Sequence, residues 1–361
     1  MLLKEISSVS SGQGAPQSKE DYCESGITFI KASDLDAIIE DQNEDRASKI
    51  TDEAFKRNKL CLFPQDTILF AKSGMSCLKN RVYVLKEASC VVNHLCCVSN
   101  VDERYDVNWI ALFLKHYNVT RFIKDNAYPS ISLKDVGSIV LPTIDKSLQK
   151  QIVESISIIQ KAIDLKRKQL EDLDELVKSK FQEMFGDVDT NDKGFETVIG
   201  KDVFSFSSGK FLSAEKRKEE GIPVYGGNGI SWFTDEALID YPTIIIGRVG
   251  AYCGNVKMVN TPVWITDNAI FIKSFKKQVF NIRFLCQLME NASFDKYADV
   301  VAQPKITQKP LENYKYIVPD IELQERFADY VKSVDMARKT VGDELVDLGE
   351  LMDSKMDEYF G

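Results

Sequence analysis

Two short segments place long hydrogen-bond donors just after an apolar run and around a glycine, Gly74 in the first segment and Gly250 in the second. The donors are Lys72, Lys79, Asn80 and Arg81 in the first segment, and Arg248, Tyr252, Asn255 and Lys257 in the second. Cationic, amide and phenol groups of this kind contact phosphate oxygens and base edges in nucleic acids. One such loop could equally be an ordinary turn, but the same loop type occurring twice favours binding. We therefore expect both segments to lie on a surface that faces DNA.

Two further loops share the sequence Ser-Ser-Gly, at residues 10–12 and 207–209. Their hydroxyl and backbone N–H groups could donate hydrogen bonds to phosphate oxygens. We therefore add Ser11 and Ser208 to the predicted DNA contacts, together with the cation Lys305.

The two glycine segments differ in ways that separate two kinds of contact. Lys72 and Arg248 stand at equivalent places, which suits a sequence-independent contact with phosphate. The two segments differ at Asn80 and Tyr252, so these residues are the better candidates for contacts with bases. The alternative for Arg248 is an ion pair with a nearby carboxylate such as that of Asp267.

The sequence lacks the motifs of enzymes that act on DNA. It has no Walker A sequence, and the glycine-rich residues 226–229 lack dinucleotide-binding spacing, so an ordinary loop is the better interpretation there. An adenine methyltransferase motif needs a Pro-Pro dipeptide, and none occurs. Asp299, Gln303 and Lys305 resemble a metal-nuclease pattern only faintly, and the corresponding residues 127–130 lack such groups. We expect no catalytic site, cofactor or metal, so the isolated chain should neither methylate nor cut DNA nor bind S-adenosylmethionine.

Histidine and cysteine usage also argues against a catalytic or metal site. There are only two histidines, and we interpret His94 as a partly buried strand residue and His116 as a helix-end residue. The eight cysteines include no CxxC pair, and most lie in apolar runs, which indicates reduced, buried thiols in a cytoplasmic protein. No apolar run approaches the roughly 18 residues that span a bilayer, and the first residues lack the order of a signal peptide.

Composition and charge limit the class of protein further. With 361 residues, 44% of them hydrophobic, the chain can form two or three domains with buried cores. A net charge of −9 excludes an unspecific coat for nucleic acid but permits a focused basic face. Residues 320–361 carry five basic and twelve acidic side chains, which we interpret as a solvated helix face, with a surface for a partner protein as the alternative.

The glycine segments belong to an internal duplication. Residues 173–186 match residues 348–361 at eight of fourteen positions with a constant offset of 175. The apolar run and glycine turn at 67–74 match 243–250 at an offset of 176. The offset of 175 also pairs Asn93 with Asn268, Leu148-Gln149 with Leu323-Gln324, and Pro129-x-Ile131-Ser132 with Pro304-x-Ile306-Thr307. Collinear matches along the whole chain indicate a duplication.

Each copy ends in one long predicted helix, at residues 146–183 and 322–359. Apolar residues recur every three or four positions in both, as in the heptad seam of a coiled coil. The seam positions are Leu148, Ile152, Ile156, Ile159, Ile163, Leu170, Leu173, Val177 and Met184, then Leu323, Phe327, Tyr330, Val334, Ala337, Val341, Leu345, Leu348, Met352 and Tyr359. We expect the two helices to pair, and the long domain between them allows an antiparallel arrangement.

The regions before the helices are expected to be mixed and rich in strands. In the first region we predict strands at 27–30, 67–71, 81–85, 90–98 and 139–141, with a helix at 108–116. In the second we predict strands at 222–225, 243–247, 256–259, 269–273 and 316–318, with a helix at 282–291. Only the first region carries an acidic insertion, at residues 34–53. The fold class is therefore α+β, with domains at 1–145 and 187–319, each followed by a spacer helix, at 146–186 and 320–361.

In the order of its parts the sequence resembles the DNA-specificity subunits of type I restriction-modification systems, over its full length. The resemblance rests on the opening loop and first strand, on the core strand with its glycine turn, and on the proline-to-helix junctions. These motifs lie at residues 11–12 and 26–35, at 66–74 and 242–250, and at 141–152 and 318–327. Their duplicated order is specific. The chain departs from the pattern in its acidic insertion and in Cys77-Leu78, which replace a second glycine after Gly74.

The resemblance implies a non-catalytic subunit that reads a split DNA sequence, one half with each recognition domain. It also implies two methyltransferase (modification) subunits that dock on the chain, and restriction–translocase subunits that join them. Because the two domains differ in sequence, the half-sites should differ, and the paired helices would set their separation. Two alternatives remain: a scaffold whose domains bind other proteins, which the acidic total favours slightly, and an orphan specificity subunit that acts as a regulator.

Overall fold

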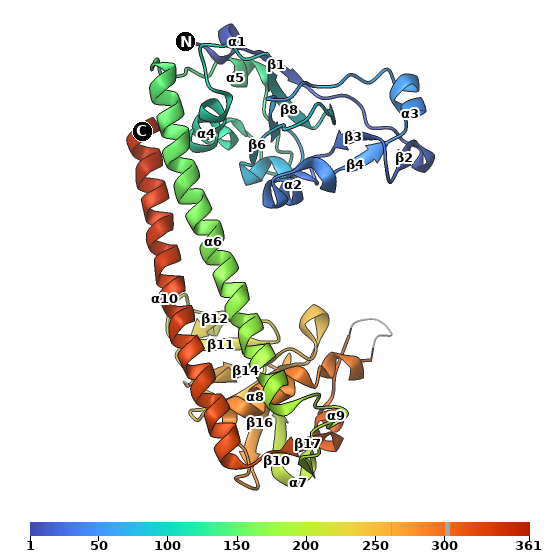
Figure 1. Ribbon diagram of the computed structural model, residues 1–361, viewed down its shortest axis with the longest axis vertical. Coiled ribbons are helices and arrows are strands. Elements are labelled where there is room, and N and C mark those ends of the chain that lie inside the picture. Colours follow the sequence, from blue (N-terminus) through green and yellow to red (C-terminus); the bar gives the residue numbers. More distant parts are fainter. Residues whose placement is uncertain (261, 300–303) are drawn as a thin grey trace. The chain divides into compact units, whose positions relative to one another are not determined.

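The structure, a computed structural model, describes residues 1–260, 262–299 and 304–361 (Figure 1). The chain divides into two compact units, Met1–Leu165 with Leu345–Gly361, and Lys166–Glu344. The long helices α6 (Lys146–Phe185) and α10 (Ile321–Phe360) contribute residues to both units. Within the described ranges, no helix is both long enough and apolar enough to cross a membrane.

The first unit is built on an antiparallel four-stranded sheet. Its strands, in spatial order, are β1 (Ser8–Ser11), β8 (Leu95–Ser99), β5 (Ile68–Ala71) and β6 (Val82–Val84). The two central strands are buried along their whole length, and helix α4 (Val107–Tyr117) packs on β6. The short helices α1 (Leu3–Ile6) and α5 (Leu133–Gly137) lie against β1. This sheet therefore holds the end of β5, where the first glycine segment begins.

A second sheet in this unit includes the acidic insertion. Its strands, in spatial order, are β2 (Tyr22–Cys23), β4 (Ser48–Ile50), β3 (Ile27–Ile30) and β7 (Cys90–Val91). The insertion contributes β4 and the helices α2 (Leu35–Asp41) and α3 (Asp52–Arg57). Leu35 and Ile38 are fully buried, and the buried Glu44 carboxylate accepts hydrogen bonds from the Tyr83 hydroxyl at 3.1 Å and the Lys86 backbone N–H at 2.7 Å. The insertion is thus a packed part of the first domain.

The second unit repeats the main sheet with the same order and direction of strands. These strands are β10 (Phe204–Ser208), β16 (Ala269–Phe275), β13 (Thr243–Gly247) and β14 (Val256–Val259). Two smaller sheets join β12 (Gly229–Thr234), β11 (Ile222–Gly226) and β15 (Trp264–Ile265), and β9 (Glu196–Ile199) with β17 (Lys315–Val318). The helices are α7 (Gly200–Val203), α8 (Ile282–Asn291) and α9 (Gln308–Asn313). The duplication seen in the sequence is therefore also a duplication of topology.

Single turns of 3-10 helix complete both units. They are η1 (Lys19–Asp21), η2 (Glu44–Arg46), η3 (Met75–Lys79), η4 (Val119–Phe122), η5 (Ala214–Lys216), η6 (Gly250–Tyr252) and η7 (Phe294–Tyr297). The turns η3 and η6 lie in the two glycine segments, and both begin at or just after the glycine.

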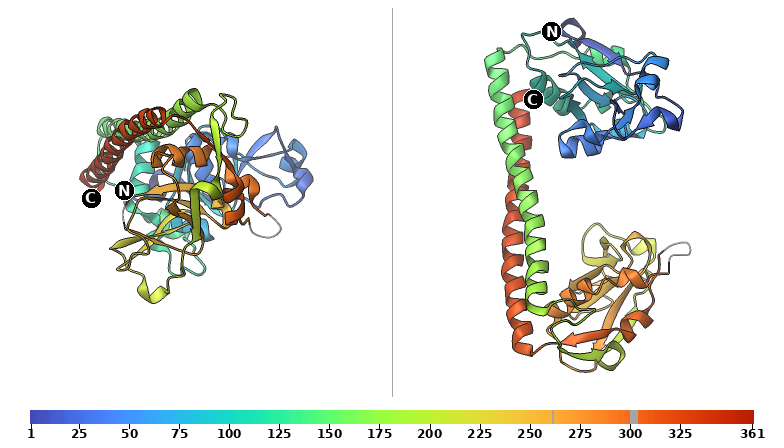
Figure 2. Two further views of the ribbon diagram at one scale, coloured as in Figure 1. Left: turned by 90° about the horizontal axis from the view of Figure 1, so that it is seen from below. Right: turned by 45° about the vertical axis from the view of Figure 1, so that its right-hand side comes forward.

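Within each unit, α6 and α10 lie side by side and run in opposite directions (Figure 2). In the first unit the buried Ile152 and Ile156 belong to the same core as Met356. In the second unit Lys166 Nζ lies 2.6 Å from a carboxylate oxygen of Glu344. The predicted antiparallel pairing is confirmed.

The seam itself differs from the prediction at its ends. Leu148 is 44% exposed, whereas the unpredicted Phe181 and Phe185 are fully buried. Both of these rings pack edge-on against Phe327 of α10, with centroids 5.4 and 5.5 Å apart. The heptad pattern did not include them because they face the second strand-rich domain as well as α10: Phe185 also contacts Phe284 of α8.

Two predicted strands differ in the structure. The run at 90–98 breaks into β7 and β8, because Val92 donates to the Ile30 carbonyl at 2.9 Å and the chain then turns toward the other sheet. Residues 139–141 form only one bridge, between Leu2 and Val140. The turn also corrects the interpretation of His94, which is exposed between the two strands. His116 lies in the last turn of α4, as predicted.

Candidate nucleic-acid interface

The two glycine segments have the same backbone geometry. Gly74 and Gly250 have φ angles of 79° and 80°, in the left-handed region that favours glycine. The Gly74 N–H donates to the Pro129 carbonyl at 3.0 Å, and the Gly250 N–H donates to the Pro304 carbonyl at 3.0 Å. The glycines are thus needed for a turn that points its backbone at a second segment.

That second segment is the Pro-x-Ile sequence found in both copies. Its isoleucine donates a further backbone hydrogen bond to the residue two positions before the glycine. The Ile131 N–H donates to the Lys72 carbonyl at 2.7 Å, and the Ile306 N–H donates to the Arg248 carbonyl at 2.9 Å. We call this pair of backbone bonds, around Gly74 or Gly250, the loop fastening. It places Lys72 and Arg248 at equivalent positions, as their sequence spacing predicts.

The Ser-Ser-Gly sequences are not loops as predicted: their serines end the edge strands β1 and β10, and their glycines bond to the neighbouring strands. The Gly12 N–H donates to the Leu95 carbonyl at 3.2 Å, and the Gly209 N–H donates to the Ala269 carbonyl at 3.0 Å. A Cβ atom on Gly12 would lie 2.2 Å from the Val91 carbonyl oxygen, so only glycine fits. These glycines therefore bring Ser11 and Ser208 close to the glycine segments.

In the second unit, Ser208 and Arg248 lie together. Arg248 Nη1 is 3.5 Å from the Ser208 hydroxyl oxygen and 3.4 Å from the Asp267 backbone carbonyl. Gln308 Nε2 lies 3.4 Å from the same hydroxyl. Arg248 has no ion pair with a carboxylate in the described ranges, so the contact with Asp267 is made through its backbone. These groups line a hollow of about 350 Å³ that also includes the exposed Lys309.

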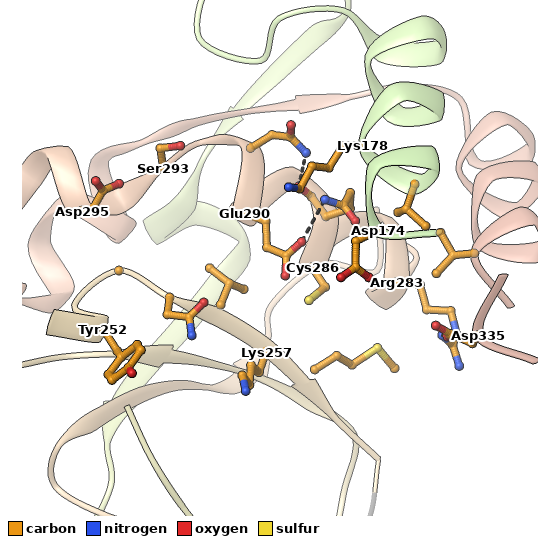
Figure 3. A pocket seen from close by; sticks show the side chains of 18 of the residues that line it. Asp174, Lys178, Tyr252, Lys257, Arg283, Cys286, Glu290, Ser293, Asp295 and Asp335 are labelled. Atoms are coloured by element: carbon orange, nitrogen blue, oxygen red, sulfur yellow. Dashed lines mark hydrogen bonds and ion pairs between the residues drawn. The ribbon is translucent and has the colours of Figure 1, made fainter. Parts of the chain in front are cut away.

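Tyr252, Asn255 and Lys257 line a different and larger cavity, of about 1100 Å³, together with residues of α6, α8 and α10 (Figure 3). All three are exposed. Figure 3 shows Tyr252 and Lys257 along one margin of the cavity and Asp174, Lys178 and Glu290 along another. The structure therefore places Ser208 and Arg248 at one hollow and Tyr252, Asn255 and Lys257 at another, while Lys305 lines neither.

The charges lining the two hollows differ. The larger cavity carries as many acids as bases, and Arg283 of α8 is paired with Asp335 of α10 at 2.6 Å. The smaller hollow carries Arg248 and Lys309 against the single acid Glu312. A polyanion is attracted to the second arrangement more than to the first, because unpaired cations dominate its lining.

In the first unit, the donors after Gly74 are engaged inside the protein. The Asp36 carboxylate of α2 lies 2.6 Å from Arg81 Nε and 3.1 Å from Lys79 Nζ. Asn80 has a left-handed backbone, with φ of 44°, and its side-chain amide donates to the Lys115 carbonyl of α4 at 2.8 Å. The structure thus gives Asn80 a role in holding the loop on α4, which its place in the sequence did not indicate.

Lys72 lies beside an exposed histidine. The Lys72 N–H donates to the His94 carbonyl at 2.9 Å, and the Ser73 hydroxyl oxygen is 2.7 Å from His94 Nδ1. In the second unit the Arg248 N–H donates to the Asn268 carbonyl at 2.9 Å. Lys72 is therefore held by the same backbone contacts as Arg248.

Two exposed lysines near these groups were missed at the level of sequence. Lys134 and Lys309 each lie at the second position of a short helix, α5 or α9, just after the loop fastening. The offset of 175 that pairs Pro129 with Pro304 also pairs these lysines. Following the repeat a few residues further along the chain would have identified them.

The remaining sequence interpretations concern catalysis and thiols. Asp299 and Lys305 pair through their backbones, at 2.9 and 3.1 Å, while Gln303 lies outside the described residues. In those described, no three His, Cys, Asp or Glu side chains are placed to hold a metal. Residues 226–229 form a hairpin between β11 and β12, so the loop interpretation is confirmed. All eight cysteines are free, and five of them are buried.

Known proteins share parts of this sequence. The sequence is 31% identical over 137 residues to the specificity subunit of the type I restriction enzyme EcoprrI of Escherichia coli. That match covers 37% of this chain and 33% of the subunit's length, and a second curated relative, from Mycoplasma genitalium, is matched over 39% of its length. The matched segments thus span between 33% and 39% of the length of these relatives.

Solved structures share the whole fold. One is the crystal structure of a type I restriction-modification S subunit from M. genitalium, with a TM-score of 0.59 and 17% identity over 100% of this chain and 95% of that one. Another comes from a study of complex assembly in the type I system, with a TM-score of 0.61 and 14% identity over 100% and 96%. Residues 1–175 and 192–342 both match the type I restriction modification DNA specificity domain. With its duplicated sheets, its antiparallel helices and these two matches, the chain belongs to the family of type I restriction-modification DNA specificity proteins.

Proposed function

We propose that this chain is the sequence-reading subunit of a type I restriction-modification complex, and that each strand-rich domain reads one half of a split DNA site. The observation that carries the proposal is the loop fastening, which occurs in both domains with the same backbone bonds. In each domain it holds one cation, Lys72 or Arg248, at the same place. Two similar modules in one chain suit a duplex whose two segments present similar phosphate backbones and different bases.

The cations and hydroxyls around the fastening are suited to phosphate. They are Ser11, Lys72 and Lys134 in the first domain, and Ser208, Arg248, Lys305 and Lys309 in the second. Contacts of this kind position a duplex without reading its sequence. Because Ser11, Lys72 and Lys134 have counterparts in Ser208, Arg248 and Lys309, a sequence-independent role fits these residues best.

Base reading falls to the residues that follow the turn, where the two domains differ. In the second domain these are Tyr252, Asn255 and Lys257, which are exposed. In the first domain Lys79 is exposed, while Asn80 and Arg81 are engaged with the protein and act by positioning the loop. Different side chains at these places predict different half-sites.

In this proposal the chain performs no chemistry itself. Methylation would belong to two modification subunits, and cleavage to restriction–translocase subunits. The absence of a Pro-Pro dipeptide and of a Walker A sequence supports this division, since the usual methyltransferase and motor motifs need them. We place the complex in the cytoplasm, where it would meet DNA.

The test is to express the chain with a type I methyltransferase subunit and to map modified bases by single-molecule sequencing. We expect methylation at one split, asymmetric sequence, and only when the chain is present. A strain with the methyltransferase alone is the control. Binding of the chain to DNA without any methylation would favour an orphan regulator, and a chain that binds protein partners but no DNA would favour a scaffold.

A further inference from the structure

We propose that Asp36 determines specificity in the first domain by holding Arg81 and Lys79, so that the loop keeps the geometry in which it reads DNA, and by keeping both cations from unspecific contacts with phosphate. The inference rests on the proposed function, because it assumes that the loop at residues 75–81 faces DNA. Its structural basis is one carboxylate that binds two cations, with Oδ1 2.6 Å from Arg81 Nε and Oδ2 3.1 Å from Lys79 Nζ. Both carboxylate oxygens are thus engaged with the loop.

The position of Asp36 is fixed by the core. It lies in α2 between Leu35 and Ile38, whose side chains are fully buried. The Asp34 carboxylate, at the start of the same helix, accepts a hydrogen bond from the Lys31 N–H at 2.9 Å. Because the helix already holds Asp36 in place, its carboxylate loses little conformational entropy when it forms ion pairs. The ion pairs therefore fix the position of the loop, and the loop does not fix the position of Asp36.

The second domain offers an internal comparison. At the repeat offset of 176, Lys79 and Arg81 correspond to Asn255 and Lys257. Lys257 Nζ lies 3.3 Å from the Asn228 backbone carbonyl and forms no ion pair in the parts of the chain that the structure describes. The acidic insertion, which only the first domain carries, therefore supplies a carboxylate at a place where the second domain has none.

Burial distinguishes the two cations that Asp36 holds. The Arg81 side chain is 11% exposed, whereas that of Lys79 is 58% exposed. A guanidinium so shielded from water is stable only with a partner, so without Asp36 the Arg81 side chain would turn out into solvent. It would then be a mobile cation on the loop, free to bind any phosphate.

The loss of Asp36 should therefore act in opposite directions on two kinds of DNA. Affinity for non-cognate DNA should rise, because a freed cation adds an interaction that does not depend on sequence. Affinity for cognate DNA should fall or stay level, because the loop at 75–81 is no longer held in the geometry that it reads with. The ratio of the two affinities is thus the property that Asp36 controls.

The experiment uses the chain assembled with its methyltransferase subunits. It measures binding of wild type and Asp36→Asn to a duplex carrying the mapped methylation site and to a scrambled duplex, across a salt series. For Asp36→Asn we expect the affinity ratio to fall by roughly tenfold. We also expect the salt slope on the scrambled duplex to steepen by about one.

Two variants make the result specific. Asp41→Asn changes the same charge on the same helix, where Asp41 pairs with Arg46 rather than with the loop, and should leave the ratio unchanged. Asp36→Glu keeps the carboxylate and should restore most of the ratio. Thermal unfolding of each variant identifies one that fails to fold. If Asp36→Asn does so, Asp36→Ser takes its place, with the same expected fall in the ratio.

The outcomes separate this inference from the proposed function. If the wild-type complex does not distinguish the two duplexes, the proposed function fails. If it does, but Asp36→Asn changes both affinities by the same factor at an unchanged salt slope, Asp36 is merely structural and the inference is overturned.

Discussion

The side-chain oxygen of Gln149 accepts a hydrogen bond from the Asp106 backbone N–H at 2.7 Å, at the point where α6 meets α4. The same side chain donates to the Ile144 carbonyl at 3.0 Å. In the second unit Gln324 does the same for Asn281, at 2.9 Å, and for the Pro319 carbonyl, at 2.8 Å. Both glutamines are almost completely buried. Each ties the start of a long helix to the first turn of the domain helix beside it.

Replacing Gln149 by Ala should destabilise the first unit by about 1–3 kcal/mol, because the Asp106 N–H and the Ile144 carbonyl would be left without a hydrogen-bond partner in a buried place. The midpoint of thermal unfolding measures the effect. Gln151→Ala, at an exposed position of the same helix, should change stability by less than about 0.5 kcal/mol. Equal effects of the two substitutions would show that the buried amide has no special role.

Replacing Gly12 by Ala should cost about 1–3 kcal/mol, since the new Cβ would meet the carbonyl oxygens of Val91 and Val92 at 2.2 and 2.3 Å. Urea unfolding is a suitable measurement. Gly14→Ala is the matched control, because a Cβ at that glycine of the same loop has no neighbour within 4 Å. A Gly12→Ala chain as stable as the control would mean that the loop shifts freely.

Removing the charge of Arg248 or Lys309 should weaken binding to all DNA sequences alike and reduce the salt slope by about one for each phosphate that is no longer neutralised. Arg248→Ala and Lys309→Ala are measured on matched and mismatched duplexes across salt concentrations. Lys277→Ala is the control, because it also removes one positive charge. β16 begins at Ala269, which pairs with Gly247 next to Arg248, and Lys277 follows the opposite end of this strand, so the salt slope should stay unchanged. An unchanged slope for Arg248→Ala would remove Arg248, and its counterpart Lys72, from the DNA surface.

Stability should fall at alkaline pH because of the buried thiols. Burial raises the pKa of the Cys90 thiol to about 11, from an ordinary value of 9.0. The folded chain therefore keeps its proton between these values while the unfolded chain releases it, so stability is unaffected below about pH 8 and declines from pH 9 toward pH 11. Comparing urea unfolding of Cys90→Ala and wild type at pH 8 and pH 10 isolates this effect. If the free energy of unfolding falls by the same amount in both chains between pH 8 and pH 10, the Cys90 thiol is not the cause.

Sequence reasoning predicted the elements whose pattern is long or repeated. The two helices, the strand at 27–30 and the helix at 282–291 follow from apolar periodicity, and the pairing of the helices follows from the duplication. Periodicity did not identify the turn at 92–94, because only two polar residues, Asn93 and His94, interrupt an otherwise apolar run at 90–98. Periodicity also placed Ile159 in the seam between the helices, but this residue is only half-buried, while Ile156 is 4% exposed.

The candidate DNA-binding residues show a similar limit. The equivalence of Lys72 and Arg248 depends on local spacing, and the structure gives both the same backbone bonds. The ion pair between Arg81 and Asp36 joins residues that are far apart in sequence, and the residue types alone do not indicate which partners will meet. Long-range ion pairs of this kind depend on how the insertion folds, which composition alone does not determine.

The loop fastening has a consequence for which substitutions the two glycine segments tolerate during evolution. All of its bonds join backbone atoms, so they do not depend on the side chains at residues 75–81 or 251–257. The exposed side chains among them, such as those of Lys79, Tyr252 and Asn255, can therefore change one at a time while the turn keeps its shape. Under the proposed function, new DNA preferences can thus arise by single substitutions on one unchanged backbone, and each intermediate chain still folds.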